Sequence, residues 1–333
     1  MPRQAAKRFA WSRRGWPASA ITSILGCLTL QPHAAAAPRF DVHAAEQVLQ
    51  RLLPQYASQF DLGAMERTES GEMFRISAAP GRVRVEGSTS SALLFGVNWY
   101  LKYVAHLHIS TNGDQLGTAS KLPMPATTIE LATPYAYRYA LNENVDGYTA
   151  AYWDFARWER EIDVLALSGI NAVLIERGAD LVLYRTFRDL GYSDREIRAW
   201  ITQPAHQNWQ LMGNLCCFNG PISMQLLQKR AASAQRIIAR LRDLGITPVL
   251  PGFYGIVPSD FRARFPHAHI VAQGEWAGFT RPDWLDPRDP MFARLASAFY
   301  RHQHNTSCLA TAASTTWRCS RKAETPATSR WQR

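Results

Sequence analysis

Residues 137–177 read YRYALNENVDGYTAAYWDFARWEREIDVLALSGINAVLIER, and this stretch decides the fold. Its first five residues, Tyr137–Leu141, have the composition of a β-strand, and Asn171–Arg177 form a second apolar strand segment. Between them, Trp153–Ser168 carries apolar side chains at helical spacing and ends before Gly169, a common helix stop. Strand, helix and strand in this order predict a βαβ unit with parallel strands.

The alternation of strands and helices continues after this unit. Two or three short helices up to about Trp209 precede a long helix over Gln225–Leu244, a third strand over Thr247–Phe253 and a further helix over Pro290–His304. Repeated βα units predict a (β/α)8 TIM barrel, whose functional residues lie on the loops after each strand. Only about three strands are present, so the predicted barrel is incomplete.

A small α+β domain is predicted before the barrel. Its elements are a helix, the two strands of a hairpin, a second helix and a Pro-rich linker, over Val42–Leu52, Phe74–Ser77, Arg82–Glu86, Ala92–Val104 and Pro123–Pro134. The fold class is therefore α/β, with an N-terminal α/β domain at residues 38–133 and the first part of a TIM barrel at residues 134–304.

Charge is the first property that bears on function. The chain has 333 residues, 47% of them hydrophobic, and a formal net charge of +10, which suggests a phosphate-rich partner. Residues 1–37 carry +5 and residues 305–333 carry +4, so residues 38–304, with 27 Lys and Arg against 26 Asp and Glu, are nearly neutral. No basic stripe occurs in this central part, and we therefore expect no nucleic-acid partner.

The N-terminal charge has an explanation of its own. A basic segment precedes an apolar run at Ala18–Leu30 and small residues at Ala34–Ala37. This pattern is typical of a secretory signal peptide over residues 1–37, and the apolar run is too short for a permanent membrane span. We expect an exported protein, periplasmic or secreted, with lipoprotein anchoring at Cys27 as the minor alternative.

Cysteines and histidines form no metal pattern. Cys216 and Cys217 are the only cysteines between the two ends, and adjacent cysteines rarely bridge each other, so we expect two idle thiols. No CxxC or HExxH motif is present, and the nine histidines are scattered. We expect neither a metal ion nor a cofactor.

Polar and aromatic residues follow each of the three predicted strands. These segments are Asn142–Tyr148, Glu176–Gly178 and Phe253–Gly255, and their composition is typical of a sugar site. The first barrel helix also carries several acids beside Arg157 and Arg160. Those acids predict a solvated, salt-bridged helix face and not catalytic groups: Asp154, Glu159, Glu161 and Asp163.

Four longer motifs resemble one known family. They are YWDFARWEREIDVLALSGIN at 152–171, WQLMGN at 209–214, GITPVLPG at 245–252 and GEW at 274–276. These motifs are similar to the signatures of the α-N-acetylglucosaminidases, glycoside hydrolase family 89, and the resemblance runs from about Tyr137 to Gln303. The segment before Pro134 is similar to the small domain that precedes this family's barrel.

The resemblance implies a function and a set of site residues. The family removes terminal α-linked N-acetylglucosamine from glycans with retention of configuration, using two carboxylates and no metal. Asn142 matches the family's contact to a sugar hydroxyl, and Asn144 stands where some members have Cys. Trp209, Met212 and Trp276 match walls of the sugar pocket, although Met212 on its own pattern would be assigned to the core.

The same resemblance implies that the catalytic pair is missing from this chain. Retaining hydrolysis needs two carboxyl groups about 5–5.5 Å apart, and both belong to strands that the family places beyond residue 304. Glu176 at a strand end and Glu275 beside Trp276 have no catalytic counterpart. We therefore expect the chain as written to be inactive; the alternative interpretation is an exported, non-catalytic glycan-binding protein.

Residues 305–333 break the barrel pattern. They contain one large aliphatic residue, Leu309, and no Gly, Val, Ile, Phe or Tyr, so they cannot extend the barrel sheet. Codons permitted for residues 309–321, read two nucleotides later, allow GDSSIYNMEVL and then PEGG, which is similar to the family's next strand. A frameshift near codon 304, in the gene or in its sequencing, is our hypothesis, and a natural disordered tail is the alternative; resequencing decides between them.

Overall fold

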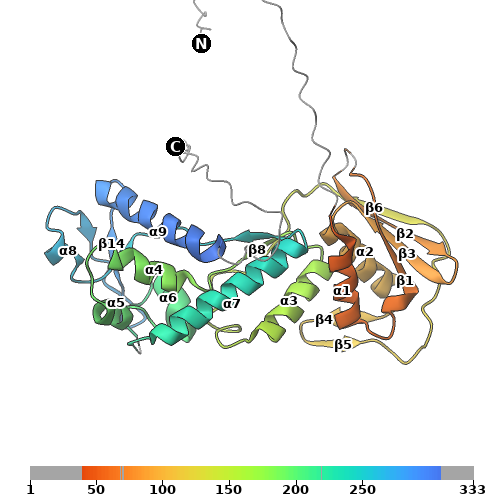
Figure 1. Cartoon of the computed structure of the whole chain (residues 1–333), viewed down its shortest axis with the longest axis horizontal. Helices are drawn as coiled ribbons and strands as arrows, with labels where there is room; N and C mark the ends of the chain where they lie inside the picture. Colours follow the sequence, from red (N-terminus) through yellow and green to blue (C-terminus); the bar gives the residue numbers. More distant parts are fainter. Residues whose placement is uncertain (1–39, 68, 70, 219, 309–333) are drawn as a thin grey trace, which may run out of the picture. The chain divides into compact units, whose positions relative to one another are not determined.

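The computed structural model describes residues 40–67, 69, 71–218 and 220–308. The predicted signal peptide at 1–37 and residues 309–333 lie outside this range, so the predictions made for them stay predictions. The described secondary structure begins with helix α1 (Val42–Leu52) and ends with helix α9 (Pro290–Cys308) (Figure 1).

A four-stranded sheet forms the centre of the N-terminal domain. Strands β2 (Glu72–Ala79) and β3 (Arg82–Gly87) pair as the predicted hairpin, and Gly81, at φ +71°, permits the tight turn between them. Strand β1 (Phe60–Ala64) pairs parallel to β3, and β6 (Ile129–Thr133) pairs antiparallel to β2. The assignment of 129–133 to a linker was wrong: this edge strand is short and largely exposed, and it lies between prolines that are typical of a linker.

Helix α2 (Ser90–Tyr103) packs against β2 and β3 and confirms the second predicted helix. It begins after Thr89, whose hydroxyl accepts a hydrogen bond from the backbone N–H of Ala92. At Gly96 the helix approaches the sheet so closely that a Cβ atom would lie 3.0 Å from the Phe74 side chain. A short hairpin, β4 (His108–Ser110) and β5 (Gly113–Gln115), follows α2.

Three parallel strands form the start of the barrel. They are β7 (Tyr139–Ala140), β8 (Ala172–Leu174) and β9 (Thr247–Val249), adjacent in that order, so the predicted βαβ units are confirmed. Each is shorter than the sequence predicts, because the chain leaves the sheet to form the loops of the strand ends. The first and last strands have no further partner among the residues described.

Two long helices cover this sheet and confirm the predicted periodicity. Helix α3 (Phe155–Leu167) joins β7 to β8, and α7 (Met224–Asp243) precedes β9 and packs against α3. Helix α3 also packs against α2, where Asn98 donates a hydrogen bond to the carbonyl of Leu167 at 2.8 Å. This contact joins the N-terminal domain to the barrel strands.

The acidic face of α3 is salt-bridged, as predicted, but it is only partly solvated. Asp163 is 1% exposed and accepts hydrogen bonds from Arg51 at 2.7 Å and Arg240 at 3.0 Å. Glu161 is also buried and pairs with Arg157. The prediction of a solvated face was wrong at these two positions, because arginines compensate the buried carboxylates: Arg51 of α1 and Arg240 of α7 at Asp163, and Arg157 of α3 itself at Glu161.

The remaining elements surround a second hydrophobic core. Helix α9 packs against helix α4 (Ala179–Arg188). Shorter elements complete this region: α5 (Asp194–Trp200), η2 (Pro204–His206), α6 (Gln207–Leu211), β10 (Ile256–Val257), α8 (Phe261–Arg264), β11 (Ile270–Val271), β12 (Glu275–Trp276), β13 (Phe279–Thr280) and β14 (Asp283–Leu285). Of these, β12 and β13 form a hairpin, which carries Trp276.

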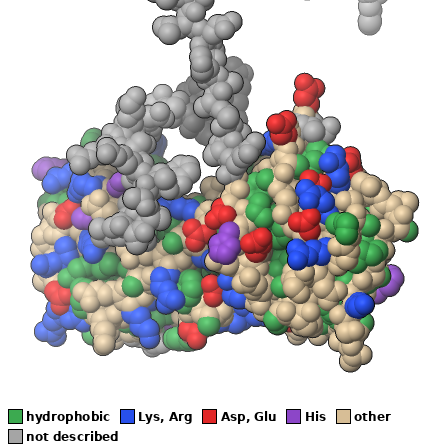
Figure 2. Space-filling view, turned by 45° about the vertical axis from the view of Figure 1, so that its right-hand side comes forward, with side chains coloured by type: hydrophobic (Ala, Val, Ile, Leu, Met, Phe, Trp, Pro, Cys, Tyr) green, Lys and Arg blue, Asp and Glu red, His purple; other side chains and the backbone are tan. Residues whose placement is uncertain are grey.

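Charges of both signs are interspersed on the face shown in Figure 2, where Lys and Arg lie beside Asp and Glu. This mixture agrees with the near-neutral composition of residues 38–304. Within the described part of the chain, no helix has the length and apolar character needed to cross a bilayer.

Candidate functional site

Three loops meet at one edge of the barrel sheet. Tyr139 pairs with Ala172, and Ala172 pairs with Thr247, so the three strands are aligned and point the same way. The segments after them therefore leave the sheet at a common edge, as the barrel prediction requires. Burial raises the pKa of Tyr254 to about 12, and the nearby carboxylates of Glu176 and Glu143 add to the shift, so one residue from each loop shares this edge.

Glu176 is the buried carboxyl group of this edge. It is 3% exposed, and its Oε2 accepts a hydrogen bond from Asn208 Nδ2 at 2.5 Å. The other oxygen, Oε1, is buried with no protein partner. Burial, helped by the neighbouring charge of Asp146, raises the pKa of Glu176 to about 8. The group is therefore protonated at neutral pH and able to donate a hydrogen bond to a ligand oxygen.

The raised pKa of Glu176 makes stability depend on pH. An unfolded glutamate ionises near pH 4.5, whereas the folded one keeps its proton up to about pH 8. Raising the pH between these values favours unfolding by up to about 1.4 kcal/mol per pH unit. We expect the urea midpoint of the wild-type chain to fall over this range more steeply than that of Glu176→Gln. The same pH dependence in both proteins would contradict a protonated Glu176.

Two arginines and two aspartates form a buried ion-pair network under the first loop. Asp146 accepts hydrogen bonds from Arg177 at 3.0 Å and from Arg230 at 2.6 Å. Arg230 also donates to Asp180 at 2.7 Å, and all four residues are at most 7% exposed. Burial lowers the pKa of Arg177, whereas the two aspartates keep that of Arg230 raised against the effect of burial.

This network fixes the first loop to the sheet. Arg177 donates hydrogen bonds to the backbone carbonyls of Ala151, at 3.2 Å, and Ala150. Arg230 donates to the side chain of Gln207, at the start of α6. The network was not predicted from the sequence, although Arg230 falls on the buried face of α7 with Leu227 and Ala234, which is a detectable signal.

Three aromatic side chains form a wall beside the strand ends, named here the aromatic wall: Tyr148, Trp209 and Trp276. The two indole rings are stacked, with centroids 4.9 Å apart and planes at 26°. Tyr148 meets Trp209 edge-on at 5.6 Å. Trp209 directly follows Asn208, the hydrogen-bond partner of Glu176, so one short helix carries both the wall residue and the contact to the buried carboxyl group. Trp276 is 37% exposed, which leaves an aromatic surface open to a ligand.

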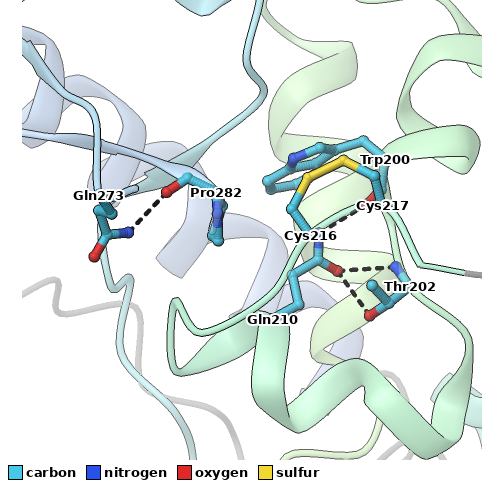
Figure 3. The surroundings of a disulfide bond; sticks show 7 residues. All are labelled: Trp200, Thr202, Gln210, Cys216, Cys217, Gln273 and Pro282. Carbon is cyan, nitrogen blue, oxygen red and sulfur yellow. Dashed lines mark hydrogen bonds between the residues drawn. A yellow bond between two sulfur atoms is a disulfide. The ribbon is translucent and has the colours of Figure 1, made fainter. Parts of the chain in front are cut away.

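Several hydrogen bonds hold the β12–β13 hairpin, and with it Trp276, in this position. Arg281 donates to the carbonyl of Gly213 at 2.8 Å, and the backbone N–H of Cys216 donates to Thr280 at 3.0 Å. At the base of the hairpin, Gln273 donates to the carbonyl of Pro282 at 2.8 Å (Figure 3). The hairpin is thus fastened to the segment that follows Trp209.

The other predicted site residues take different positions. Asn142 is exposed, and its Oδ1 accepts a hydrogen bond from the backbone N–H of Asn144 at 3.1 Å. Asn144 is half-buried, and its Oδ1 is buried without a protein partner. Met212 is half-buried at the C-terminal end of α6, and Glu275 is exposed on β12. The structure therefore brings Trp209 and Trp276 together, with both asparagines on the loop that the ion-pair network holds.

The site is an open surface. The cavities that touch Glu176 measure about 10 and 20 Å³, far below the several hundred Å³ of an enclosed ligand pocket. Across the described ranges, no group of three or more His, Cys, Asp or Glu side chains is arranged to hold a metal ion. Recognition at this surface would use aromatic contact and hydrogen bonds.

Cys216 and Cys217 form a disulfide bond between adjacent residues, beside the indole of Trp200 (Figure 3). The expectation of two idle thiols was therefore wrong. The chain turns at Cys217, whose φ is +62°, and this turn is what the general rule about neighbouring cysteines does not anticipate. Nearby, Gln210 accepts hydrogen bonds from Thr202 and donates to the carbonyl of Trp200, which fixes the wall segment of α6.

The disulfide can be tested by alkylation. We expect the peptide containing Cys216 and Cys217 to take up no iodoacetamide in the unreduced chain, even after denaturation, because neither sulfur is a thiol. After reduction it should gain two labels, which mass spectrometry resolves. A synthetic peptide with one free cysteine, added to the same sample, serves as the control for labelling. Two labels without reductant would contradict the bond.

Comparison with known proteins gives two family matches. The family described as "Alpha-N-acetylglucosaminidase (NAGLU) tim-barrel domain" matches residues 138–319. The corresponding N-terminal domain matches residues 43–124. The first match covers more than half of the chain and ends inside the segment 305–333.

Similar proteins with names or structures agree with these matches. The chain is 37% identical over 224 residues to human alpha-N-acetylglucosaminidase, covering 66% of this chain and 30% of that protein. A family 89 glycoside hydrolase from Clostridium perfringens, in complex with 2-acetamido-1,2-dideoxynojirmycin, is 30% identical with a TM-score of 0.75 over 79% of this chain. The same bacterium's enzyme, in complex with its substrate GlcNAc-alpha-1,4-galactose, gives 30% identity and a TM-score of 0.76 over 80% of this chain. The chain spans about 31% of each of these structures.

Proposed function

The chain belongs to the α-N-acetylglucosaminidase family, and on this premise we propose that its strand-end surface is the N-acetylglucosamine-recognition part of a glycosidase for terminal α-linked N-acetylglucosamine. The observation that carries this proposal is the aromatic wall. Trp209 and Trp276 come from separate segments and stack 4.9 Å apart, and Trp209 directly follows Asn208, whose side chain bonds to the buried Glu176.

The polar groups of the surface complement an acetamido sugar. A pyranose ring presents an apolar face that packs against an indole, and Trp276 offers an exposed one. The sugar's N–H group needs a hydrogen-bond acceptor. Asn144 Oδ1 is such an acceptor, and it is buried without a hydrogen-bond partner in the protein. The sugar's oxygens need donors, and the protonated carboxyl of Glu176 has one buried oxygen without a hydrogen-bond partner.

The same surface supplies no complete catalytic pair. Retaining hydrolysis uses one acid/base carboxyl and one ionised nucleophile about 5–5.5 Å apart. Glu176 holds its proton, and the carboxyl oxygens of the neighbouring Asp146 accept hydrogen bonds from Arg177 and Arg230. We therefore propose that the chain of 333 residues binds the sugar without hydrolysing it. The two catalytic carboxyls would come from later strands of a complete barrel.

An NMR experiment tests both parts of this proposal at once. Nitrophenyl α-N-acetylglucosaminide is incubated with the full chain, with the β-anomer as the matched control ligand. We expect saturation transfer from the protein to the acetamido methyl group and ring protons of the α-glycoside, and an intact glycosidic bond after the incubation. Hydrolysis of the α-glycoside would contradict the absence of a catalytic carboxyl pair. Equal saturation transfer to both anomers would contradict selective recognition of the α-linkage.

A further inference from the structure

Asn208, in the short helix α6, lies where three parts of the strand-end surface meet. It directly precedes Trp209 of the aromatic wall. Its side-chain Nδ2 donates one hydrogen bond to the backbone carbonyl of Glu143 in the first loop. It donates another to Glu176 Oε2, beyond the end of β8, at 2.5 Å. The amide nitrogen carries two hydrogens, so these two acceptors use both of them.

The surroundings leave the Asn208 side chain one place to lie. The residue is buried, and Gly147 of the first loop faces it. A Cβ atom at position 147 would collide with Asn208 Oδ1, so a larger residue there would displace the amide. The preceding residue, Gln207, accepts a hydrogen bond from Arg230 at 2.7 Å. The start of α6 is therefore tied both to the ion-pair network and to the first loop.

The two hydrogen bonds of Asn208 fix groups that face the sugar in the proposed function. Glu143 stands between Asn142 and Asn144, so the bond to its carbonyl holds the loop at the middle of the asparagine pair. The bond to Glu176 engages Oε2 and leaves Oε1 as the oxygen without a partner. Loss of the amide would leave a buried carbonyl and a buried carboxyl oxygen unsatisfied, which favours rearrangement of the loop.

We propose that Asn208 is a positioning residue for N-acetylglucosamine recognition, whose amide holds the first loop and the Glu176 carboxyl in fixed positions relative to Trp209. Since Asn208 is buried, it acts through these groups and does not contact the sugar itself. It lies just before the WQLMGN motif at 209–214, so the family resemblance assigned it no role. The ligand rests on the proposed function, whereas the hold on the first loop depends on the contacts of Asn208 alone.

Two substitutions of similar size test this role. Asn208→Leu removes both donors, whereas Asn208→Asp introduces a carboxyl group that regains one donor when it is protonated. Burial and neighbouring acidic groups favour that protonation at about pH 5 over about pH 7. The charged groups that act on the adjoining Glu176 carboxyl are Glu143 and Asp146 of the first loop and Arg230 of α7. All of them are present in the wild-type chain, which is the reference at each pH.

Asn98→Asp is the matched control. Asn98 is also buried and donates from Nδ2 to a backbone carbonyl, that of Leu167, at the opposite end of α3 from the first loop. Isothermal titration calorimetry measures the affinity for N-acetylglucosamine at both pH values, and thermal melts show which variants are folded. Hydrogen exchange of residues 145–150 needs no sugar, because the backbone amides of this segment donate hydrogen bonds within the loop.

We expect Asn208→Asp to bind the sugar at least about tenfold more weakly than the wild-type chain at about pH 7 and to recover most of this loss at about pH 5. Asn208→Leu should bind weakly at both pH values. Both variants should exchange the amides of residues 145–150 faster than the wild-type chain. Asn98→Asp should match the wild-type chain in affinity and in the exchange of this segment. Gly147→Ala keeps the amide but displaces it, and should also weaken binding if a substitution at 208 prevents folding.

Three results would overturn the positioning role. They are wild-type affinity in Asn208→Asp at about pH 7, a loss that is the same at both pH values, and an equal loss in Asn98→Asp. Unchanged exchange of residues 145–150 in the folded Asn208 variants would also overturn it, whether or not the sugar binds. A wild-type chain that binds no N-acetylglucosamine would instead refute the proposed function, so the two failures are distinguishable.

Discussion

Replacing Arg230 by Met is expected to lower the free energy of unfolding by about 3–5 kcal/mol. Arg230 is 3% exposed, and its guanidinium bonds to Asp146 at 2.6 Å and Asp180 at 2.7 Å. A Met side chain fills a similar volume but leaves two buried carboxylates with too little positive charge around them. Urea unfolding followed by tryptophan fluorescence measures the loss.

Lys229→Met is the matched control for Arg230→Met. The two positions are adjacent on α7, and Met replaces a basic residue at each. Lys229, however, is exposed and has no ion-pair partner among the described residues. We expect a change of less than about 0.5 kcal/mol in the control. A loss below about 1 kcal/mol for Arg230→Met would mean that the buried network does not hold the first loop as described.

The second large effect is expected on sugar binding. Trp276→Ala should weaken binding of N-acetylglucosamine by about 2 kcal/mol, or roughly thirtyfold, because an exposed indole that forms the contact surface is removed. Trp276 packs on Trp209 and lies outside the core, so the fold should persist. Isothermal titration calorimetry measures the affinity.

Two further variants make the Trp276 result specific. Trp276→Phe keeps an aromatic ring and should recover part of the affinity. Tyr137→Ala removes an aromatic residue that is 85% exposed at the edge of the barrel sheet, away from the strand ends, and should bind the sugar normally. Equal affinities for Trp276→Ala and the wild-type chain would exclude the aromatic wall from the sugar site.

Helices and their ends were largely predictable from the sequence. Helix α1 has the predicted bounds, because its apolar residues recur regularly, and α3 and α7 agree within two residues. The parallel arrangement of β7, β8 and β9 followed from the order of strands and helices. The loops that follow the three strands could also be assigned to one edge of the barrel sheet, because the carboxyl ends of parallel strands lie at the same edge.

Long-range polar contacts were not predictable in the same way. Arg230 and Asp146 are 84 residues apart, and nothing in the local pattern pairs them. The link between Asn208 and Glu176 likewise depends on how α6 folds back over β8. Strand β6 was not predicted, because its edge position leaves most of its side chains exposed. Trp276 was placed at the sugar site by resemblance, but its stacking on Trp209 needed the hairpin geometry.

A crystal structure of the full chain soaked with N-acetylglucosamine shows whether the aromatic wall binds this sugar. We expect the sugar ring against Trp276 on the aromatic wall, with its acetamido or hydroxyl groups within hydrogen-bond distance of Glu176 or Asn144. Sugar bound elsewhere on the folded chain, with the aromatic wall and Glu176 empty at saturating concentration, would contradict it.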